Sequence, residues 1–270
     1  MTTTHEPKRV RTLHLQRFKD EGRPFTMLTS YDALTARVFD RAGVDTLLIG
    51  DSIGNNVLGY PNTLRVSLQQ IADATAAVSG AVERALVIAD MPFGSYEASD
   101  EQAVNSAVKL MKAGAHAVKL EGGQRIRTRI AAIVDAGIPV VGHLGFTPQS
   151  EQRLGGFRIQ GRDEQSVAEL TADALAVQEA GAIAVVLEMV AGEAAREITA
   201  QLRIPTIGIG AGNGTDGQVL VWTDFAGLNT QGVPRFVKQY ADVAGVLTQA
   251  AEAYITDVRD RAFPDEAHTY

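Results

Sequence analysis

Two charged side chains interrupt a short apolar segment of the sequence. In AGAHAVKLEGG, residues 113–123, Lys119 and Glu121 stand two positions apart, and a β-strand would place both on the same face. A buried lysine or glutamate without a partner destabilises a protein, because each loses its contact with water. The pair therefore indicates a site where charges from other segments, or from a ligand, balance these two.

Other polar residues follow apolar segments in the same way. They are Asp51 and Ser52 after residues 46–50, Asp90 after 85–89, His143 after 138–142 and Glu188 after 182–187. Several have an ordinary alternative role: Asp51 and Asp90 as caps of the next helix, Lys119 as a chain reaching water from a strand end, and His143 as a hydrogen-bonded rim residue. Their shared position after apolar segments favours one common site.

A hard divalent cation would balance such a set of carboxylates. The candidate ligands are oxygen donors and the chain has no cysteine, so the site would suit Mg²⁺. Mg²⁺ usually takes one or two protein carboxylates and keeps water or substrate in its other positions. We expect Asp51 and Asp90 to bind the metal directly, and Glu121 to bind it directly or through a water molecule.

A repeated unit would position these residues. Ala-Gly, a short bend and a brief apolar run recur at residues 42–52, 113–123, 136–145 and 180–190, with helical patterns between them. The Ala-Gly pair is typical of a helix end with glycine in the left-handed conformation, and the apolar run is typical of a strand buried on both faces. The sequence predicts eight strands, near residues 25–30, 46–50, 85–89, 116–120, 138–142, 182–187, 205–208 and 218–221.

Strands that alternate with helices predict a parallel sheet, and its closure into a (β/α)₈ TIM barrel is the expected fold. A doubly wound open sheet is the alternative, but it calls for a glycine-rich turn after the first strand, and MLTSYDAL has none. Residues 1–270 are predicted to form one domain, with short tails at about 1–12 and 262–270 and a last helix from Val233 to about Asp257. In a barrel, the carboxyl ends of the strands carry the active site. The glycine-rich segment GIGAGNGTDGQ is either a connection or a phosphate cradle.

Composition and charge narrow the class of protein. Of 270 residues, 45% are hydrophobic and 21% are charged, which is typical of a globular protein. The net charge of -7 argues against nucleic acid or an anionic membrane as the main partner. The absence of cysteine excludes disulfides and thiol nucleophiles. No apolar run approaches the roughly 20 residues of a membrane span, and the N-terminus lacks the apolar segment of a secretory signal, so we expect a cytoplasmic enzyme.

Several segments, in one order, resemble the ketopantoate hydroxymethyltransferase family. They are MLTSYD, GDSIGNNVLGYPNT, ADMPFGSY, VKLEGG, GHLGFTPQS, GGFRIQGR, VLEMV and IGIGAGNGTDGQVLV. The resemblance implies a barrel of the phosphoenolpyruvate/pyruvate type, Mg²⁺ held by Asp51 and Asp90 with Glu121 in the metal shell, and a homodecamer.

The resemblance also implies a reaction. A hydroxymethyl group would pass from 5,10-methylenetetrahydrofolate to 3-methyl-2-oxobutanoate, giving ketopantoate in pantothenate biosynthesis. Glu188 matches the family's proposed base, and the residues that match its contacts to the 2-oxo acid are Asp51, Ser52, Asp90 and Lys119. His143 would position the substrate or assist at the metal.

Three other functions stay open from the sequence. One is a Mg²⁺-dependent lyase or mutase of the same barrel superfamily that acts on 2-oxo or phospho acids. Another is a barrel that binds a small acid without catalysis. A sugar isomerase that binds phosphate at the glycine-rich segment is the weakest of the three.

Overall fold

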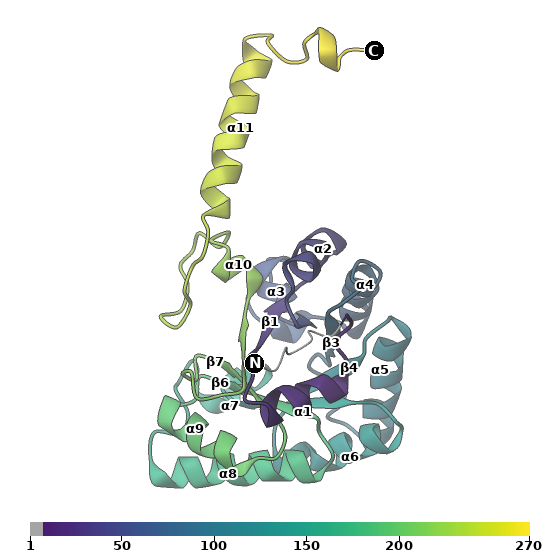
Figure 1. Ribbon diagram of the computed structural model, residues 1–270, viewed down its shortest axis with the longest axis vertical. Coiled ribbons are helices and arrows are strands. Elements are labelled where there is room, and N and C mark those ends of the chain that lie inside the picture. Colours follow the sequence, from purple (N-terminus) through teal and green to yellow (C-terminus); the bar gives the residue numbers. More distant parts are fainter. Residues whose placement is uncertain (1–7) are drawn as a thin grey trace. The chain divides into compact units, whose positions relative to one another are not determined.

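Eight parallel strands form a closed barrel in the computed structural model, which describes residues 8–270 (Figure 1). They are β1 Phe25–Thr29, β2 Thr46–Ile49, β3 Leu86–Asp90, β4 Ala117–Glu121, β5 Val140–Gly145, β6 Ala184–Glu188, β7 Thr206–Ile209 and β8 Gly217–Leu220. The strands pair in sequence order and β8 pairs with β1, so the ring has no free edge. The predicted barrel is confirmed and the open sheet is excluded. Each strand lies within three residues of its predicted bounds.

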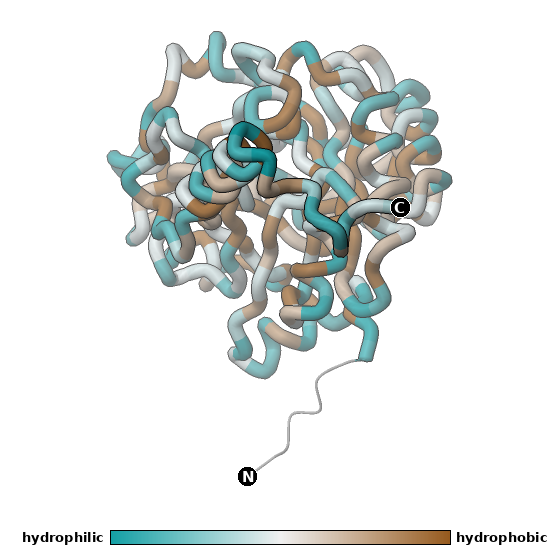
Figure 2. The backbone as a smooth tube through the Cα atoms, turned by 90° about the horizontal axis from the view of Figure 1, so that it is seen from above, coloured by the Kyte–Doolittle hydropathy of each residue, from teal (hydrophilic) through white to brown (hydrophobic). Residues whose placement is uncertain are grey.

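Helices surround the strands (Figure 1). They are α1 Thr12–Asp20, α2 Ala33–Ala42, α3 Ile53–Asn56, α4 Leu68–Ser79, α5 Asp100–Lys112, α6 Arg127–Asp135, α7 Glu151–Leu154, α8 Glu164–Glu179 and α9 Gly192–Gln201. The four Ala-Gly units end helices as predicted, with Gly43, Gly114, Gly137 and Gly181 at φ between 83° and 106°. Figure 2 shows hydrophobic and hydrophilic residues in turn along the chain, the pattern of helices that pack one face against the strands.

The glycine-rich segment after β7 replaces a helix. Residues 210–216 join β7 directly to β8 and pack on α9. A Cβ atom added to Gly214 would lie 2.9 Å from Cβ of Arg196, and one added to Gly212 would lie 3.2 Å from Cα of Gly192. Small residues are therefore needed for close approach to the helix, which favours a connecting role for this segment.

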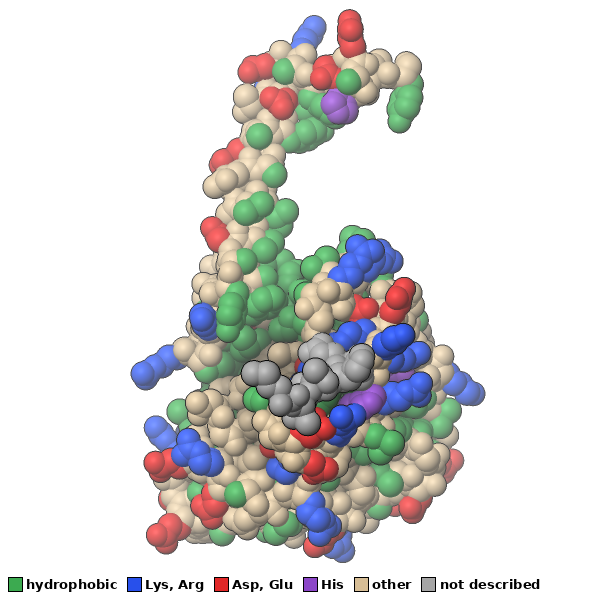
Figure 3. Space-filling model, in the orientation of Figure 1, with side chains coloured by type: hydrophobic (Ala, Val, Ile, Leu, Met, Phe, Trp, Pro, Cys, Tyr) green, Lys and Arg blue, Asp and Glu red, His purple; other side chains and the backbone are tan. Residues whose placement is uncertain are grey.

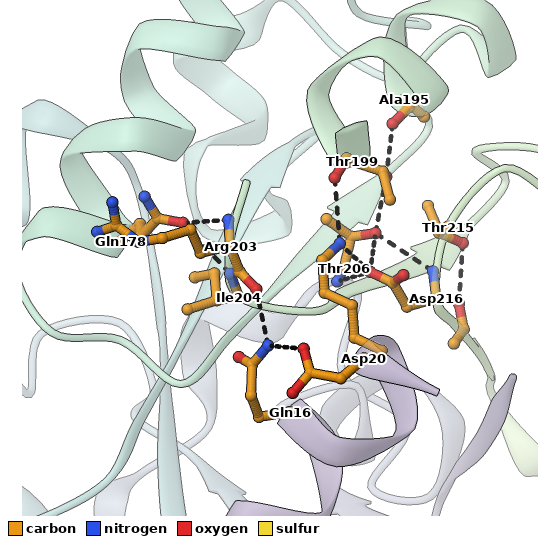
Figure 4. A network of polar contacts seen from close by, with 12 residues as sticks. Gln16, Asp20, Gln178, Ala195, Thr199, Arg203, Ile204, Thr206, Thr215 and Asp216 are labelled. Atoms are coloured by element: carbon orange, nitrogen blue, oxygen red, sulfur yellow. Dashed lines mark hydrogen bonds and ion pairs between the residues drawn. The ribbon is translucent and has the colours of Figure 1, made fainter. Parts of the chain in front are cut away.

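Helix α1 is tied to the amino ends of β7 and β8 (Figure 4). The side chain of Gln16 donates to the carbonyl of Arg203 at 2.9 Å, and Lys19 Nζ lies 2.9 Å from Asp216 Oδ2. The same Asp216 oxygen accepts the backbone N–H of Thr206 at 2.8 Å. These contacts lie at the end of the barrel opposite the carboxyl ends of the strands, so we expect them to stabilise the fold without touching substrate.

The first residues that the structure describes already pack against the barrel. Val10, which falls within the predicted N-terminal tail, is 1% exposed and donates its N–H to the carbonyl of Arg84 at 2.7 Å. Residues 1–7 of that tail lie outside the described residues. Within residues 8–270, no helix has the length and apolar composition that crossing a membrane requires.

Residues 221–270 form a second compact unit of the chain. It contains α10 Trp222–Phe225 and α11 Val243–Arg259. The prediction of a helix from Val233 is wrong at its start, because the Asp242 side chain accepts the N–H of Gly245 at 2.9 Å and caps α11 there. Apolar side chains lie along the exposed surface of α11 (Figure 3), among them Val246, Leu247 and Tyr254.

Candidate active site

The carboxyl ends of neighbouring strands bring the predicted residues together. In the strand register, Asp90 is paired with Lys119, Glu121 with His143, and Gly145 with Glu188. We call six residues the charged cluster: Asp51, Asp90, Lys119, Glu121, His143 and Glu188. Each of the first five is at most 6% exposed, and the Glu188 side chain is 17% exposed. The cluster is therefore a buried site with one accessible carboxylate.

Lys119 is held inside the cluster by Asp90. Its Nζ lies 2.7 Å from Asp90 Oδ1, and His143 Nδ1 is 3.0 Å away. Burial alone would lower the pKa of Lys119, but the nearby carboxylates of Asp90, Glu121 and Asp51 raise it. The ammonium group therefore stays charged, and the alternative in which Lys119 reaches out to water is wrong.

His143 joins two carboxylates across the end of β5. Its Nδ1 lies 3.3 Å from Glu121 Oε1, and its Nε2 lies 3.1 Å from Glu188 Oε2. Burial and the Lys119 charge act to lower the pKa of His143, but hydrogen bonds with Glu121 and Glu188 raise it to about 9. The protonated imidazole therefore forms an ion pair with Glu188.

Asp51 adds a carboxylate that no cation offsets directly. Its backbone N–H donates to Asp90 Oδ2 at 2.9 Å. Burial raises its pKa well above the usual range, and the negative charges of Asp90 and Glu121 raise it further. The cluster holds four carboxylates against the two basic side chains of Lys119 and His143, so it would gain stability from additional positive charge.

Ser52 lies at the edge of the cluster. Its hydroxyl is 2.8 Å from the Tyr31 hydroxyl, and it follows Asp51 directly in the chain. A Cβ atom added to Gly50 would lie 2.7 Å from Ser52 Oγ and 3.5 Å from Asp90 Oδ2. A side chain at position 50 would therefore crowd the Ser52 hydroxyl.

Two functional candidates were missed by sequence reasoning. Gln149 is 7% exposed and its side-chain amide donates to Asp51 Oδ2 at 2.9 Å. Tyr96 is 2% exposed and its hydroxyl donates to Gln149 Oε1 at 2.7 Å. Burial raises the pKa of Tyr96, and the charge of Glu121 raises it further, so the hydroxyl keeps its proton. Gln149 and Tyr96 stand in the resemblance segments GHLGFTPQS and ADMPFGSY, which was the only sequence signal for them.

The backbone around Glu188 is unusual on both sides. Met189 adopts a φ of 49°, which is uncommon outside glycine. Gly145, beside Glu188 on the next strand, has a φ of 88°, and a Cβ there would lie 2.3 Å from the Glu188 carbonyl oxygen. Backbone strain is therefore present at Met189, directly after Glu188, and the absence of a side chain at Gly145 leaves room for the Glu188 carbonyl oxygen.

The residues present fit a divalent cation in charge and donor type. Within residues 8–270, no group of three or more His, Asp or Glu side chains is arranged to hold a metal ion as it stands. Mg²⁺ usually needs only one or two protein carboxylates, however, and the adjacent Asp51 and Asp90 supply two. Among the described residues no hydrogen bond reaches Asp51 Oδ1, so this oxygen is available to a ligand.

A cavity of about 730 Å³ begins beside the cluster. It is lined by Glu121 and residues 122–125 after β4, by parts of residues 144–154 at the end of β5 and after it, and by α8. Its position leaves room for a second, larger molecule next to the charged groups.

Comparisons with known proteins find relatives over nearly the whole chain. The family described as Ketopantoate hydroxymethyltransferase matches residues 9–266. A 3-methyl-2-oxobutanoate hydroxymethyltransferase of Leifsonia xyli subsp. xyli (strain CTCB07) is 57% identical over 265 residues, which cover 98% of this chain and 95% of the relative. A protein of the same name from Corynebacterium glutamicum is 56% identical over 266 residues, covering 98% of each chain.

Solved structures at low identity share the fold. A crystal structure of phosphonopyruvate hydrolase in complex with oxalate and Mg²⁺ has a TM-score of 0.63 at 15% identity and covers 96% of this chain and 93% of its own. A 2,3-dimethylmalate lyase, described as a member of the PEP mutase/isocitrate lyase superfamily, has a TM-score of 0.59 at 19% identity and covers 96% and 91%. These likenesses show the same (β/α)₈ barrel fold. On the full-length match and the relatives above, the chain belongs to the ketopantoate hydroxymethyltransferase family.

Proposed function

We propose that the charged cluster takes a proton from C3 of 3-methyl-2-oxobutanoate, and that C3 then forms a bond to the methylene carbon of 5,10-methylenetetrahydrofolate. The family membership assigns the overall activity, that of a 3-methyl-2-oxobutanoate hydroxymethyltransferase. In the balanced reaction, one water molecule supplies the hydroxyl oxygen, and the products are ketopantoate and tetrahydrofolate.

Glu188 is our candidate for the base, and its geometry supports this role best. His143 Nε2 lies 3.1 Å from Glu188 Oε2 as an ion pair, while no described residue forms a hydrogen bond with Oε1. The side chain is 17% exposed at the rim of an otherwise buried cluster. A carboxylate with one anchored and one free oxygen can receive a proton in a fixed direction.

Lys119 and Ser52 are proposed to bind the 2-oxo acid. The Lys119 ammonium is a point charge that can pair with the substrate carboxylate, or with the oxygen that becomes negative when C3 loses its proton. Asp90 keeps it charged and in place. The Ser52 hydroxyl, beside Asp51, can donate to the acid and orient it.

Mg²⁺ is proposed to be held by Asp51 and Asp90, with Glu121 in its shell. A divalent cation there would supply Lewis-acid stabilisation of negative charge on the keto oxygen. The surplus of carboxylates in the cluster supports this assignment. The cavity beside Glu121 is the proposed space for the folate co-substrate. The homodecamer and the cytoplasmic location stay predictions from the resemblance and the composition.

The substitution Glu188→Gln tests the proposal, because the amide keeps the shape but cannot take the proton. With Mg²⁺ and 3-methyl-2-oxobutanoate in D₂O, the wild type should exchange the C3 proton without any folate. By calorimetry, the variant should still bind the keto acid. It should exchange the C3 proton more slowly, by about 10²–10⁴-fold, which is the usual contribution of a general base. Full exchange in the variant would remove Glu188 as the base. Absence of exchange in the wild type would favour a barrel that only binds the acid.

A further inference from the structure

A residue outside the barrel strands reaches the centre of the cluster. Gln149 lies in the short turn Pro148–Ser150 after β5 and is 98 residues from Asp51 in sequence. Its Nε2 donates to Asp51 Oδ2 at 2.9 Å and to the Met91 carbonyl at 3.0 Å. Both hydrogens of the amide nitrogen are thus used.

The chemistry of its neighbours fixes which way the amide points. The Met91 carbonyl can only accept a hydrogen bond, so it requires the nitrogen end of the amide, which then also faces Asp51 Oδ2. The Tyr96 hydroxyl donates to the oxygen end at 2.7 Å. Tyr96 also accepts the backbone N–H of Glu121 at 3.3 Å. The amide is therefore held at both ends by buried groups.

The same residue also fixes a second carboxylate. The backbone N–H of Gln149 donates to Glu121 Oε2 at 3.0 Å. Gln149 therefore orients two of the three carboxylates that we assign to the metal shell. These are Asp51, which follows β2, and Glu121, which ends β4.

A neutral donor has a specific advantage at this position. Lys119 already places one positive charge beside Asp90, and a lysine or arginine in place of Gln149 would add a second one that competes with a bound cation. An amide orients the carboxylate and leaves its charge in place. Asp51 Oδ2 is held while Oδ1 receives no hydrogen bond from the described residues, which presents one oxygen in a fixed direction.

We propose that Gln149, oriented by Tyr96, is a positioning residue that presents the carboxylates of Asp51 and Glu121 to a divalent cation. The inference rests on the metal site of the proposed function and adds to it the residues that set its affinity. Partners that orient metal ligands typically change metal affinity by 10–100-fold when they are removed.

The test is the Mg²⁺ affinity of the full-length enzyme, measured by calorimetry without substrate. Gln149→Met keeps the length of the side chain and the backbone N–H to Glu121 but loses the amide. We expect its Mg²⁺ dissociation constant to rise by about 10–100-fold. The Mg²⁺ concentration for half-maximal C3 exchange should rise in parallel, while the rate at saturating Mg²⁺ should change much less.

Two further variants make the test decisive. Tyr96→Phe removes a single hydroxyl and should weaken Mg²⁺ binding in the same direction, so it decides the question if Gln149→Met does not fold. Gln178→Met is the matched control: Gln178 is also buried, at 8% exposure, and accepts the N–H of Arg203 at 2.6 Å near the start of β7, away from the cluster. It should lower the melting temperature without changing Mg²⁺ affinity.

Wild-type Mg²⁺ affinity in folded Gln149→Met, or in Tyr96→Phe, would overturn the positioning role while leaving the proposed function intact. A wild-type enzyme that binds no Mg²⁺ and exchanges C3 without it would instead remove the proposed metal site, and the inference with it.

Discussion

Replacing Gly145 with alanine tests whether the backbone between β5 and β6 sets the position of Glu188. The added Cβ would lie 2.3 Å from the Glu188 carbonyl oxygen and 2.6 Å from Cγ2 of Val190. The oxygen is a backbone atom that also accepts the N–H of Phe146 at 2.8 Å, so it cannot move aside by a rotamer change. The substitution must therefore displace the end of one of the two strands.

The expected loss of stability in Gly145→Ala has two parts. Alanine at a φ of 88° costs about 1–2 kcal/mol, because a side chain is disfavoured in the left-handed region. Forcing an extra methyl group into a packed region typically adds about 1–3 kcal/mol. The free energy of unfolding should thus fall by about 2–5 kcal/mol in total.

Gly137→Ala is the matched control. Gly137 has a φ of 83°, close to that of Gly145, but an added Cβ there meets nothing within 4 Å. This variant should lose only the conformational part, about 1–2 kcal/mol. The difference between the two variants therefore measures the steric contact with the Glu188 backbone.

Urea unfolding of both variants gives the two free energies, and C3 exchange in D₂O reports the position of Glu188. Gly145→Ala should lose more stability and should exchange more slowly than the wild type even where it is fully folded. Gly137→Ala should exchange at the wild-type rate. Equal losses of stability in the two variants, with normal exchange in both, would refute the link between Gly145 and Glu188.

Two more substitutions separate the two ends of the barrel. Asp90→Asn keeps an acceptor for the Asp51 N–H but weakens both the pair with Lys119 and the proposed metal contact. The Mg²⁺ concentration required for C3 exchange should therefore rise by at least about tenfold. An unchanged requirement would count against Asp90 as a ligand. Asp216→Ala removes the partner of Lys19 and of the Thr206 N–H at the opposite end of the barrel. The free energy of unfolding in urea should fall by about 1–3 kcal/mol, while the KM for the keto acid should stay the same. An altered KM would show that this end of the barrel affects the site.

The fold was predictable because its signals are local. Each Ala-Gly unit marks a helix end through the left-handed conformation of its glycine, and each short apolar run marks a strand covered on both faces. The start of α11 was not predicted correctly. The predicted helix begins at Val233, whereas the Asp242 cap places its start at Val243.

The charged residues of the site were predictable for a related reason. A charge at the end of an apolar strand stands out in the sequence, and a barrel brings all such ends to one rim. The contacts between them were not predictable. Lys119, expected to face the substrate, is already paired with Asp90 at 2.7 Å, and His143 joins Glu121 to Glu188.

Gln149 could not be found from local pattern at all. It lies in a polar turn, where glutamine is unremarkable, and its partner Asp51 is 98 residues away. Only the three-dimensional path of residues 146–150 back over the rim creates the contact. The residues that orient a site are therefore harder to predict than the charged residues they orient.

The most direct test of the site is the metal dependence of C3 exchange in the wild type. The enzyme is stripped of divalent cations, mixed with 3-methyl-2-oxobutanoate in D₂O without folate, and followed by NMR before and after Mg²⁺ is added. We predict that exchange is slow in the stripped enzyme and is restored by Mg²⁺. Fast exchange in the stripped enzyme, unchanged by Mg²⁺, would contradict the role of the Asp51 and Asp90 carboxylates as a cation site.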